Sequence, residues 1–166
     1  MKFIADVMLG SLAKALRLRG FDVLYDKTLD DNAVIRLSLE QQRVILTRDK
    51  ALSERPLATN HLFITSEVVD DQLSQVLAAF PDHGSPKPLT RCSQCNERLV
   101  ALPREEARDL VPEFVYESCP AFLRCAACGR VYWQGSHVER MGRVRSKEKE
   151  KPGPQKRNRD DRNGEG

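Results

Sequence analysis

The chain has 166 residues, 40% of them hydrophobic and 31% charged, which suits one ordinary domain or a small domain joined to an accessory module. No stretch approaches the roughly 18 consecutive apolar residues that span a bilayer, and the first residues lack the pattern of a signal peptide, so we expect a cytoplasmic protein without a membrane partner. The formal net charge of +3 comes from residues 143–166, where nine Lys and Arg accompany five Asp and Glu, while the rest of the chain carries 18 cationic and 19 anionic residues. The net charge of the whole chain is therefore no evidence for nucleic-acid binding.

Residues 1–82 alternate between strand-like and helix-like hydrophobic patterns. Short apolar runs typical of buried strands occupy residues 3–5, 23–25, 44–47 and 62–65. Apolar residues spaced three or four apart indicate helices over about residues 9–19, 34–42 and 73–80. Strands that alternate with helices through short connections predict an α/β domain, with a parallel sheet and helices on both of its faces.

Aspartates follow the strands of this predicted sheet. Asp6 comes directly after the first strand, and Asp30 and Asp31 lie in the loop after the second. Asp49 follows the third strand, in the stretch "VILTRDKAL". The carboxyl ends of parallel strands share one edge of a sheet, where ligands bind, and clustered carboxylates there would favour Mg²⁺ or Mn²⁺. The sequence thus predicts a catalytic metal site that activates water and stabilises a reacting phosphate.

The same acidic residues also suit local structural roles. Asp31 is a natural N-cap for the second helix, and Asp6 could cap the first. Asp49 could be a turn residue paired with one of the cations beside it. Asp70 and Asp71 precede the last helix of the α/β region and are better explained as caps than as metal ligands.

Three cations near this edge could meet phosphate oxygens. They are Lys14 and Arg17, on the first helix, and Arg48, beside the third strand. Lys14 and Arg17 lie off the apolar stripe of their helix, so a solvated helix face is the more ordinary explanation for both.

All five cysteines lie in the second half of the chain, and four of them form two Cys-x-x-Cys pairs, Cys92 with Cys95 and Cys125 with Cys128. In a chain without a secretory signal this spacing indicates a tetrahedral structural Zn²⁺ site rather than disulfides. The 29 residues between the pairs leave room for a helical insert. His137 could be a ligand or contact RNA, although a single His is more often structural.

Other residues of the cysteine region have simpler expected roles. Asn96 and Gly129 follow the second cysteine of each pair, where the turn favours residues that tolerate a positive φ. Cys119 is expected to be a small buried hydrophobe rather than a fifth ligand. Tyr132 and Trp133 could stack on bases, but packing against the zinc core is the favoured use.

A stretch rich in proline and glycine, residues 81–89, is typical of a linker. It separates an expected α/β domain, residues 1–82, from an expected zinc ribbon module, residues 90–141. Residues 142–166 contain almost no apolar side chains, and we predict that this basic tail is disordered.

Four stretches together resemble the Mut-seven C-terminal ribonuclease domain family: "FIADVMLGSLAKALRLRGFDVLYD", "DDNAVIRLSLEQQRVILTRDKAL", "RCSQCNERL" and "CPAFLRCAACGRVYWQGSHVERM". The resemblance covers roughly residues 2–141. This family joins a PIN-like nuclease domain to a zinc ribbon, so the resemblance implies metal-dependent ribonuclease activity. The family's acidic positions fall here on Asp6, on Asp31 with Asp30 beside it, and on Asp49. A fourth acid, at the start of the last α/β helix, falls on Asp70 or Asp71.

The leading hypothesis is a ribonuclease in which Asp6, Asp31 and Asp49 bind Mg²⁺ or Mn²⁺ and a structural Zn²⁺ occupies the ribbon. The alternative is a non-catalytic RNA-binding protein that uses the ribbon and the basic tail. A phospho-accepting receiver domain fits poorly, because it needs a further strand that bears a Lys. The expected partner is RNA, either free or within the ribosome or another ribonucleoprotein.

Overall fold

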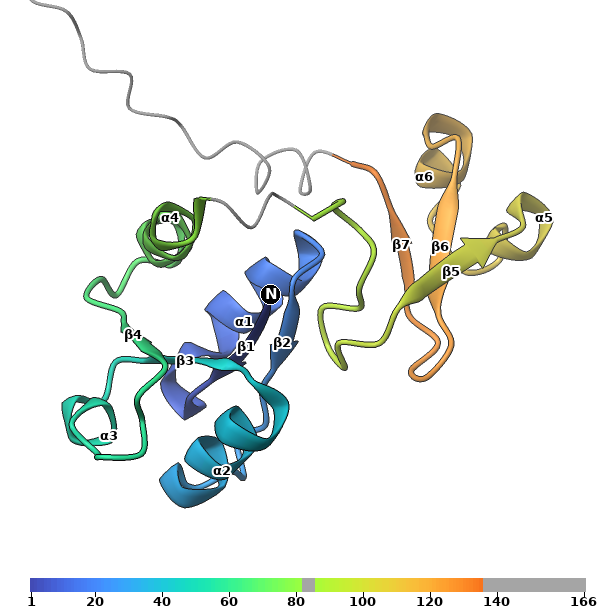
Figure 1. Ribbon diagram of the computed structural model, residues 1–166. Helices are drawn as coiled ribbons and strands as arrows, with labels where there is room; N and C mark the ends of the chain where they lie inside the picture. The colour runs from blue at the N-terminus through green and yellow to red at the C-terminus, as the bar shows by residue number, and fades with distance from the viewer. Residues whose placement is uncertain (82–85, 136–166) are drawn as a thin grey trace, which may run out of the picture.

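The computed structural model describes residues 1–81 and 86–135, which form two parts with different sheets (Figure 1). The first part holds a four-stranded sheet in the order β2-β1-β3-β4, and each neighbouring pair is parallel. Its strands are β1 (Lys2–Ala5), β2 (Asp22–Leu24), β3 (Val44–Thr47) and β4 (His61–Phe63). Its helices are the 3-10 helix η1 (Val7–Leu9), α1 (Gly10–Leu18), α2 (Asp31–Gln41), α3 (Lys50–Ser53) and α4 (Val69–Ala79).

Alternate residues of the central strands face two separate hydrophobic clusters. Phe3 and Leu46 pack with residues of α1 and α4 on one face of the sheet. Ile4 and Ile45 pack with residues of α2 and α3 on the other face. All four side chains are fully buried, and burial of each contributes about 1.5–3 kcal/mol to stability. The prediction of a parallel sheet covered by helices on both faces is confirmed.

The predicted elements differ from the observed ones at their ends, and one short helix was not predicted. β4 stops at Phe63, and Ile64 is instead a buried residue of the cluster that contains α1 and α4. The four-residue helix α3 was not predicted, because so short a helix carries no hydrophobic period. α1 is followed by Gly20, whose φ of 90° is in the region that favours glycine, as its role as a stop signal requires.

The second part is a three-stranded antiparallel sheet in the order β5-β6-β7. Its strands are β5 (Leu99–Leu102), β6 (Phe122–Cys125) and β7 (Val131–Trp133). Two short helices, α5 (Arg104–Ala107) and α6 (Glu113–Ser118), connect β5 to β6 and confirm the predicted helical insert. The apolar side chains of this part form a third cluster around Phe122, separate from the two clusters of the parallel sheet.

Some expectations fall outside the described residues, namely the basic tail at residues 142–166, the role of His137 and the centre of the linker. The domain limits at residues 82 and 90 stay a prediction. In the ranges 1–81 and 86–135, no helix is long and apolar enough to cross a membrane.

Candidate functional site

Asp6 directly follows β1 and is almost fully buried, with 4% of its surface exposed. Its Oδ1 accepts a hydrogen bond from the Met8 amide at 2.6 Å, so Asp6 is the N-cap of η1. Its Oδ2 accepts hydrogen bonds from the Thr47 hydroxyl and, at 3.3 Å, from the Arg48 amide. Asp6 therefore caps the 3-10 helix η1 rather than α1, whose N-cap is Leu9. Groups at the end of β3 fix the other carboxylate oxygen of Asp6.

Thr47 connects the acids at the ends of β1 and β3. It is fully buried, and its hydroxyl donates to Asp6 while accepting a hydrogen bond from the Asp49 amide at 2.9 Å. Asp49 is the N-cap of α3, since its Oδ1 accepts hydrogen bonds from the amides of Ala51 at 2.7 Å and Leu52 at 3.3 Å. A carboxylate lies where the apolar strand ends because it caps the next helix. The Thr47 hydroxyl contacts the carboxylate of Asp6 and the backbone amide of Asp49.

The cations near this edge differ in their contacts. Arg48 pairs with Glu67 at 2.8 Å rather than with Asp49. Lys14 is exposed on α1, as a solvated helix face requires. Arg17 is 2% exposed, so the predictions of a phosphate contact and of a solvated position are both wrong for it. The cause is a tertiary contact between α1 and the cysteine part of the chain, which local periodicity does not reveal.

At the start of α2, two neighbouring aspartates exchange the expected roles. The N-cap is Asp30, whose Oδ1 accepts a hydrogen bond from the Ala33 amide at 2.7 Å. Asp31 is the half-buried first residue of the helix, so its prediction as the N-cap is wrong. The extended backbone of Asp30, with φ −82° and ψ 170°, is the conformation that an N-cap needs. The N-cap role, which was the structural alternative to metal binding for Asp31, is thus filled by Asp30.

At the start of α4, neither predicted aspartate caps the helix. Val68 is the N-cap residue, and Asp70 and Asp71 both lie in the first turn. The Ser66 hydroxyl accepts a hydrogen bond from the Val68 amide at 3.1 Å and donates to Asp71 at 3.2 Å. The capping prediction is therefore wrong, although negative charge in the first turn still interacts favourably with the helix dipole.

The acids at these four connections lie at the carboxyl edge of the parallel sheet, because each follows a strand or begins the helix after it. In the described ranges, no three carboxylates have ligand atoms within 4.8 Å of one another. Their donor atoms are oxygens only, as Mg²⁺ requires, and this ion usually keeps several waters and contacts one or two carboxylates. The described carboxylates are therefore of the donor type that Mg²⁺ uses, but they do not form a three-carboxylate cluster.

The four cysteines of the predicted zinc site do gather, and their sulfur atoms all lie within 4.8 Å of one another: Cys92, Cys95, Cys125 and Cys128. The Sγ atoms of Cys92 and Cys128 are 3.6 Å apart, and those of Cys95 and Cys125 are 3.4 Å apart. Zinc–sulfur bonds of about 2.3 Å in a tetrahedron place the sulfurs about 3.8 Å apart. The cluster therefore fits Zn²⁺ with a small adjustment of the sulfur positions.

The turns after each cysteine pair have the predicted left-handed conformation. Asn96 has a φ of 66° and Gly129 a φ of 74°. The Asn96 amide donates to the Cys92 carbonyl at 3.0 Å, and the Gly129 amide donates to the Cys125 carbonyl at 2.9 Å. We call residues 92–96 the first cysteine turn and residues 125–129 the second. Their matching geometry directs two thiols from each turn toward one point.

Within the cluster, the thiols differ in acidity. Burial raises the pKa of the Cys92 thiol, but hydrogen bonds from the Tyr132 hydroxyl, at 3.1 Å, and from the amides of the first turn outweigh it and lower the pKa to about 6. Desolvation and the neighbouring thiols raise the pKa of Cys95 to about 12. Adjacent thiolates repel each other, so a bound divalent cation is what allows all four to lose their protons.

The remaining cysteine stands apart from this cluster. Cys119 is 7% exposed, packs in the cluster around Phe122, and its thiol donates to the Gln134 carbonyl at 3.5 Å. Trp133 packs against the same apolar cluster, and Tyr132 contacts Cys92. The expectations of a buried Cys119 and of Tyr132 beside the zinc core are confirmed, whereas Trp133 packs against the apolar cluster around Phe122 instead.

Two parts of this arrangement were missed in the sequence. The hydrophobic pattern identifies Thr47 only as the end of an apolar strand. Its hydroxyl, two residues before Asp49, was the available signal of a polar contact there. The polar contacts of Arg17 and Asp22 with the first cysteine turn had no local signal, because they join residues more than 70 positions apart.

A protein-family model described as the Mut7-C RNAse domain matches residues 1–145 of the chain. The match includes the whole parallel sheet, the four clustered cysteines and the strands around them. Comparisons with curated proteins and with solved structures found no match.

Proposed function

The chain belongs to the Mut7-C RNAse domain family, and from this premise we propose that it is a Mg²⁺- or Mn²⁺-dependent ribonuclease. In this proposal Asp6, Asp31 and Asp49 hold the catalytic cation at the carboxyl edge of the parallel sheet. RNA is the substrate, either free or within the ribosome or another ribonucleoprotein.

The observation that carries the proposal is the position of Thr47 between two acids. One buried hydroxyl contacts the carboxylate of Asp6 and the backbone of Asp49, so both residues are oriented before any ligand binds. Preorganised groups lower the cost of assembling a metal centre. Both oxygens of the nearly buried Asp6 carboxylate have donors, so its position is set by the fold.

The bound cation would polarise the reacting phosphate of the RNA and lower the pKa of a water molecule bound to the cation. Asp6, Asp31 and Asp49 would supply the ligand oxygens, and Asp71 would add negative charge from the first turn of α4. Asp30 positions this edge by capping α2. Together these residues would bind the cation and orient the water that it activates.

The four clustered cysteines would hold a structural Zn²⁺. A complete set of four thiolates leaves no open coordination position, which is typical of structural rather than catalytic zinc. The ion would join the first cysteine turn, which precedes β5, to the second, which begins at the end of β6. It would thereby stabilise a part of the chain that has only a small hydrophobic core.

The test is cleavage of single-stranded and structured RNA with the catalytic cation present or absent. Removal of Mg²⁺ and Mn²⁺ by dialysis into metal-free buffer, rather than by a strong chelator, leaves the thiolate site loaded. Asp49→Asn removes one charge but keeps an oxygen that still accepts the hydrogen bonds that cap α3. We expect cleavage to depend on the added cation and to fall by orders of magnitude in this variant.

The matched control is Asp26→Asn, at an exposed carboxylate whose hydrogen bonds are to Thr28. This variant should cleave RNA like the wild type. Equal cleavage without the cation, or an Asp49→Asn variant that loses only stability, would favour the non-catalytic RNA-binding alternative.

A further inference from the structure

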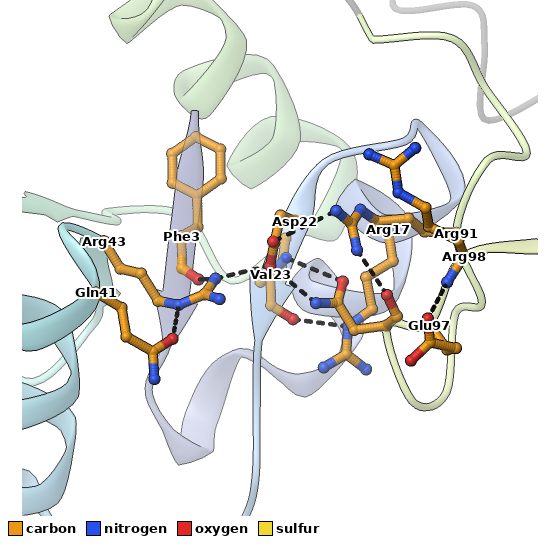
Figure 2. Close-up of polar contacts among 10 residues, drawn as sticks. Phe3, Arg17, Asp22, Val23, Gln41, Arg43, Arg91, Glu97 and Arg98 are labelled. Atoms are coloured by element: carbon orange, nitrogen blue, oxygen red, sulfur yellow. Dashed lines mark hydrogen bonds and ion pairs between the residues drawn. The ribbon is translucent and has the colours of Figure 1, made fainter. Parts of the chain in front are cut away.

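The first cysteine turn lies against the open edge of the parallel sheet, where β2 has a strand neighbour on one side only (Figure 2). Edge strands present backbone groups that need partners. Val23, in the middle of β2, donates its N–H to the Asn96 side chain at 3.1 Å. Its carbonyl accepts a hydrogen bond from Arg17 Nε at 2.8 Å. Both backbone groups of Val23 are therefore satisfied by side chains, one from α1 and one from the cysteine turn.

Arg17 extends this contact into the turn itself. Its Nη1 donates to the carbonyls of Ser93 at 3.1 Å and Gln94 at 2.7 Å. These residues lie between Cys92 and Cys95, so the positions of both carbonyls depend on how the two cysteines are held. Arg17 is 2% exposed, and loss of these acceptors would leave its charged guanidinium poorly paired in the interior.

Asp22 carries the contact further into the sheet (Figure 2). Its Oδ1 accepts hydrogen bonds from Asn96 Nδ2 at 2.9 Å and from Arg43 Nη1 at 2.7 Å. Its Oδ2 pairs with Arg91 at 3.4 Å. Arg43 also donates to the Phe3 carbonyl at 3.1 Å. A continuous set of polar contacts thus joins the first cysteine turn to β2 and β1.

We propose that metal binding at the four cysteines stabilises the α/β part of the chain, because the metal fixes the turn that covers β2. This inference rests on the Zn²⁺ binding proposed above. A ligand that binds only the folded turn also stabilises the contacts that need that turn. Without the metal, residues 93–96 are less constrained, so the contacts of Asn96 with Val23 and Asp22 and those of Ser93 and Gln94 with Arg17 weaken. The edge of the sheet then opens more often. The zinc site is then a support of the nuclease sheet, in addition to its role in its own module.

Two matched substitutions separate this effect from general damage. Asn96→Gly keeps a residue that adopts the positive φ of this position and removes the hydrogen bonds to Val23 and Asp22. Gly129→Asn makes the reverse exchange at the corresponding position of the second cysteine turn, where the nearest atom to a new Cβ is 3.9 Å away. In the described residues, the second turn hydrogen-bonds within its own part of the chain.

The experiment is hydrogen–deuterium exchange of the full chain, stripped of metal and then reloaded with Zn²⁺, with zinc content measured by elemental analysis. In the wild type we expect Zn²⁺ to slow exchange in residues 10–24 by about tenfold, the size of one or two hydrogen bonds. In Asn96→Gly this difference should shrink several-fold while zinc content stays at one ion per chain. Gly129→Asn should behave like the wild type.

A zinc effect confined to residues 91–135 of the wild type would overturn the inference while leaving zinc binding and RNA cleavage untouched. An undiminished effect in Asn96→Gly would overturn it as well. A wild-type chain that binds no Zn²⁺ would overturn both the inference and the proposed zinc site, and elemental analysis identifies that case.

Discussion

The hydroxyl of Thr47 donates a hydrogen bond to the carboxylate of Asp6, 41 positions away in the chain. The contact joins the ends of β1 and β3, which are neighbours in the parallel sheet. The same hydroxyl accepts the amide proton of Asp49. Thr47 is therefore a positioning residue for two of the proposed metal ligands, and its substitution tests the site without removing any carboxylate.

Thr47→Val removes this hydroxyl and nearly preserves the shape of the side chain. We expect the free energy of unfolding to fall by about 1–3 kcal/mol, because the buried Asp6 carboxylate loses a donor. RNA cleavage should fall about 10–100-fold, the usual effect of removing a group that orients a metal ligand. Urea unfolding measures the first change, and initial cleavage rates measure the second.

Thr47→Ser keeps the hydroxyl and should retain most of the activity. The Mg²⁺ concentration that gives half-maximal cleavage should rise in Thr47→Val and change little in Thr47→Ser. If Thr47→Val loses stability but keeps the wild-type dependence on Mg²⁺, the hydroxyl serves the fold alone.

The second prediction concerns Asp6 and Asp49 together. If both hold one cation, Asp6→Asn and Asp49→Asn should each lower cleavage by orders of magnitude, and the double variant should be little worse than the poorer single variant. This double-mutant cycle compares the cleavage rates of the wild type, both single variants and the double variant at saturating Mg²⁺. Circular dichroism checks that each variant is folded. Fully additive losses would mean that the two residues act separately.

The strands and the longer helices of the α/β part could be predicted because their patterns are local. The side chains on either side of Ile4 and of Ile45 face one hydrophobic cluster, while Ile4 and Ile45 face the other. Strands covered on both sides are apolar in this continuous way. The cysteine spacing and the left-handed turns at Asn96 and Gly129 were equally readable, since each depends on a few adjacent residues.

The missed features depend on the backbone or on tertiary contacts. The N-cap of α2 is Asp30 rather than Asp31, and nothing in two adjacent aspartates shows which of them has the extended backbone. Arg17 is charged and lies off the apolar stripe of α1, yet it is buried by the first cysteine turn. Sequence periodicity describes a helix face, but not the segment that later covers it.

The third prediction concerns the sulfur ligands. Cys92→Ser and Cys128→Ser should each abolish tight Zn²⁺ binding, because each removes one of four thiolates in a closed site. Cys119→Ala should keep one zinc ion per chain, since this thiol contacts the Gln134 carbonyl and not the cluster. Elemental analysis of protein purified without chelator decides the matter, and a halved zinc content in Cys119→Ala would show that the ligand set is wrong.

The fourth prediction is a pH dependence that comes from Asp22. Burial raises the pKa of its carboxyl, but the hydrogen bonds from Arg43 and Asn96 outweigh burial and hold the pKa below its usual value. A carboxyl with a lowered pKa in the folded state contributes stability above its unfolded pKa of about 3.9. That contribution is lost as the pH falls through the folded pKa.

Asp22→Asn should therefore lower the free energy of unfolding at neutral pH by about 2 kcal/mol, because Arg43 and Arg91 lose their charged acceptor. The deficit relative to wild type should be constant above about pH 4 and shrink below it, as the wild-type carboxyl also loses its charge. Urea unfolding at pH values from about 2.5 to about 7 measures the free energy of unfolding of both proteins across this titration. Asp109→Asn, at an exposed position of the cysteine part, should show no such convergence. Parallel curves for wild type and Asp22→Asn throughout this range would show that the ionised carboxylate does not stabilise the contact between β2 and the first cysteine turn.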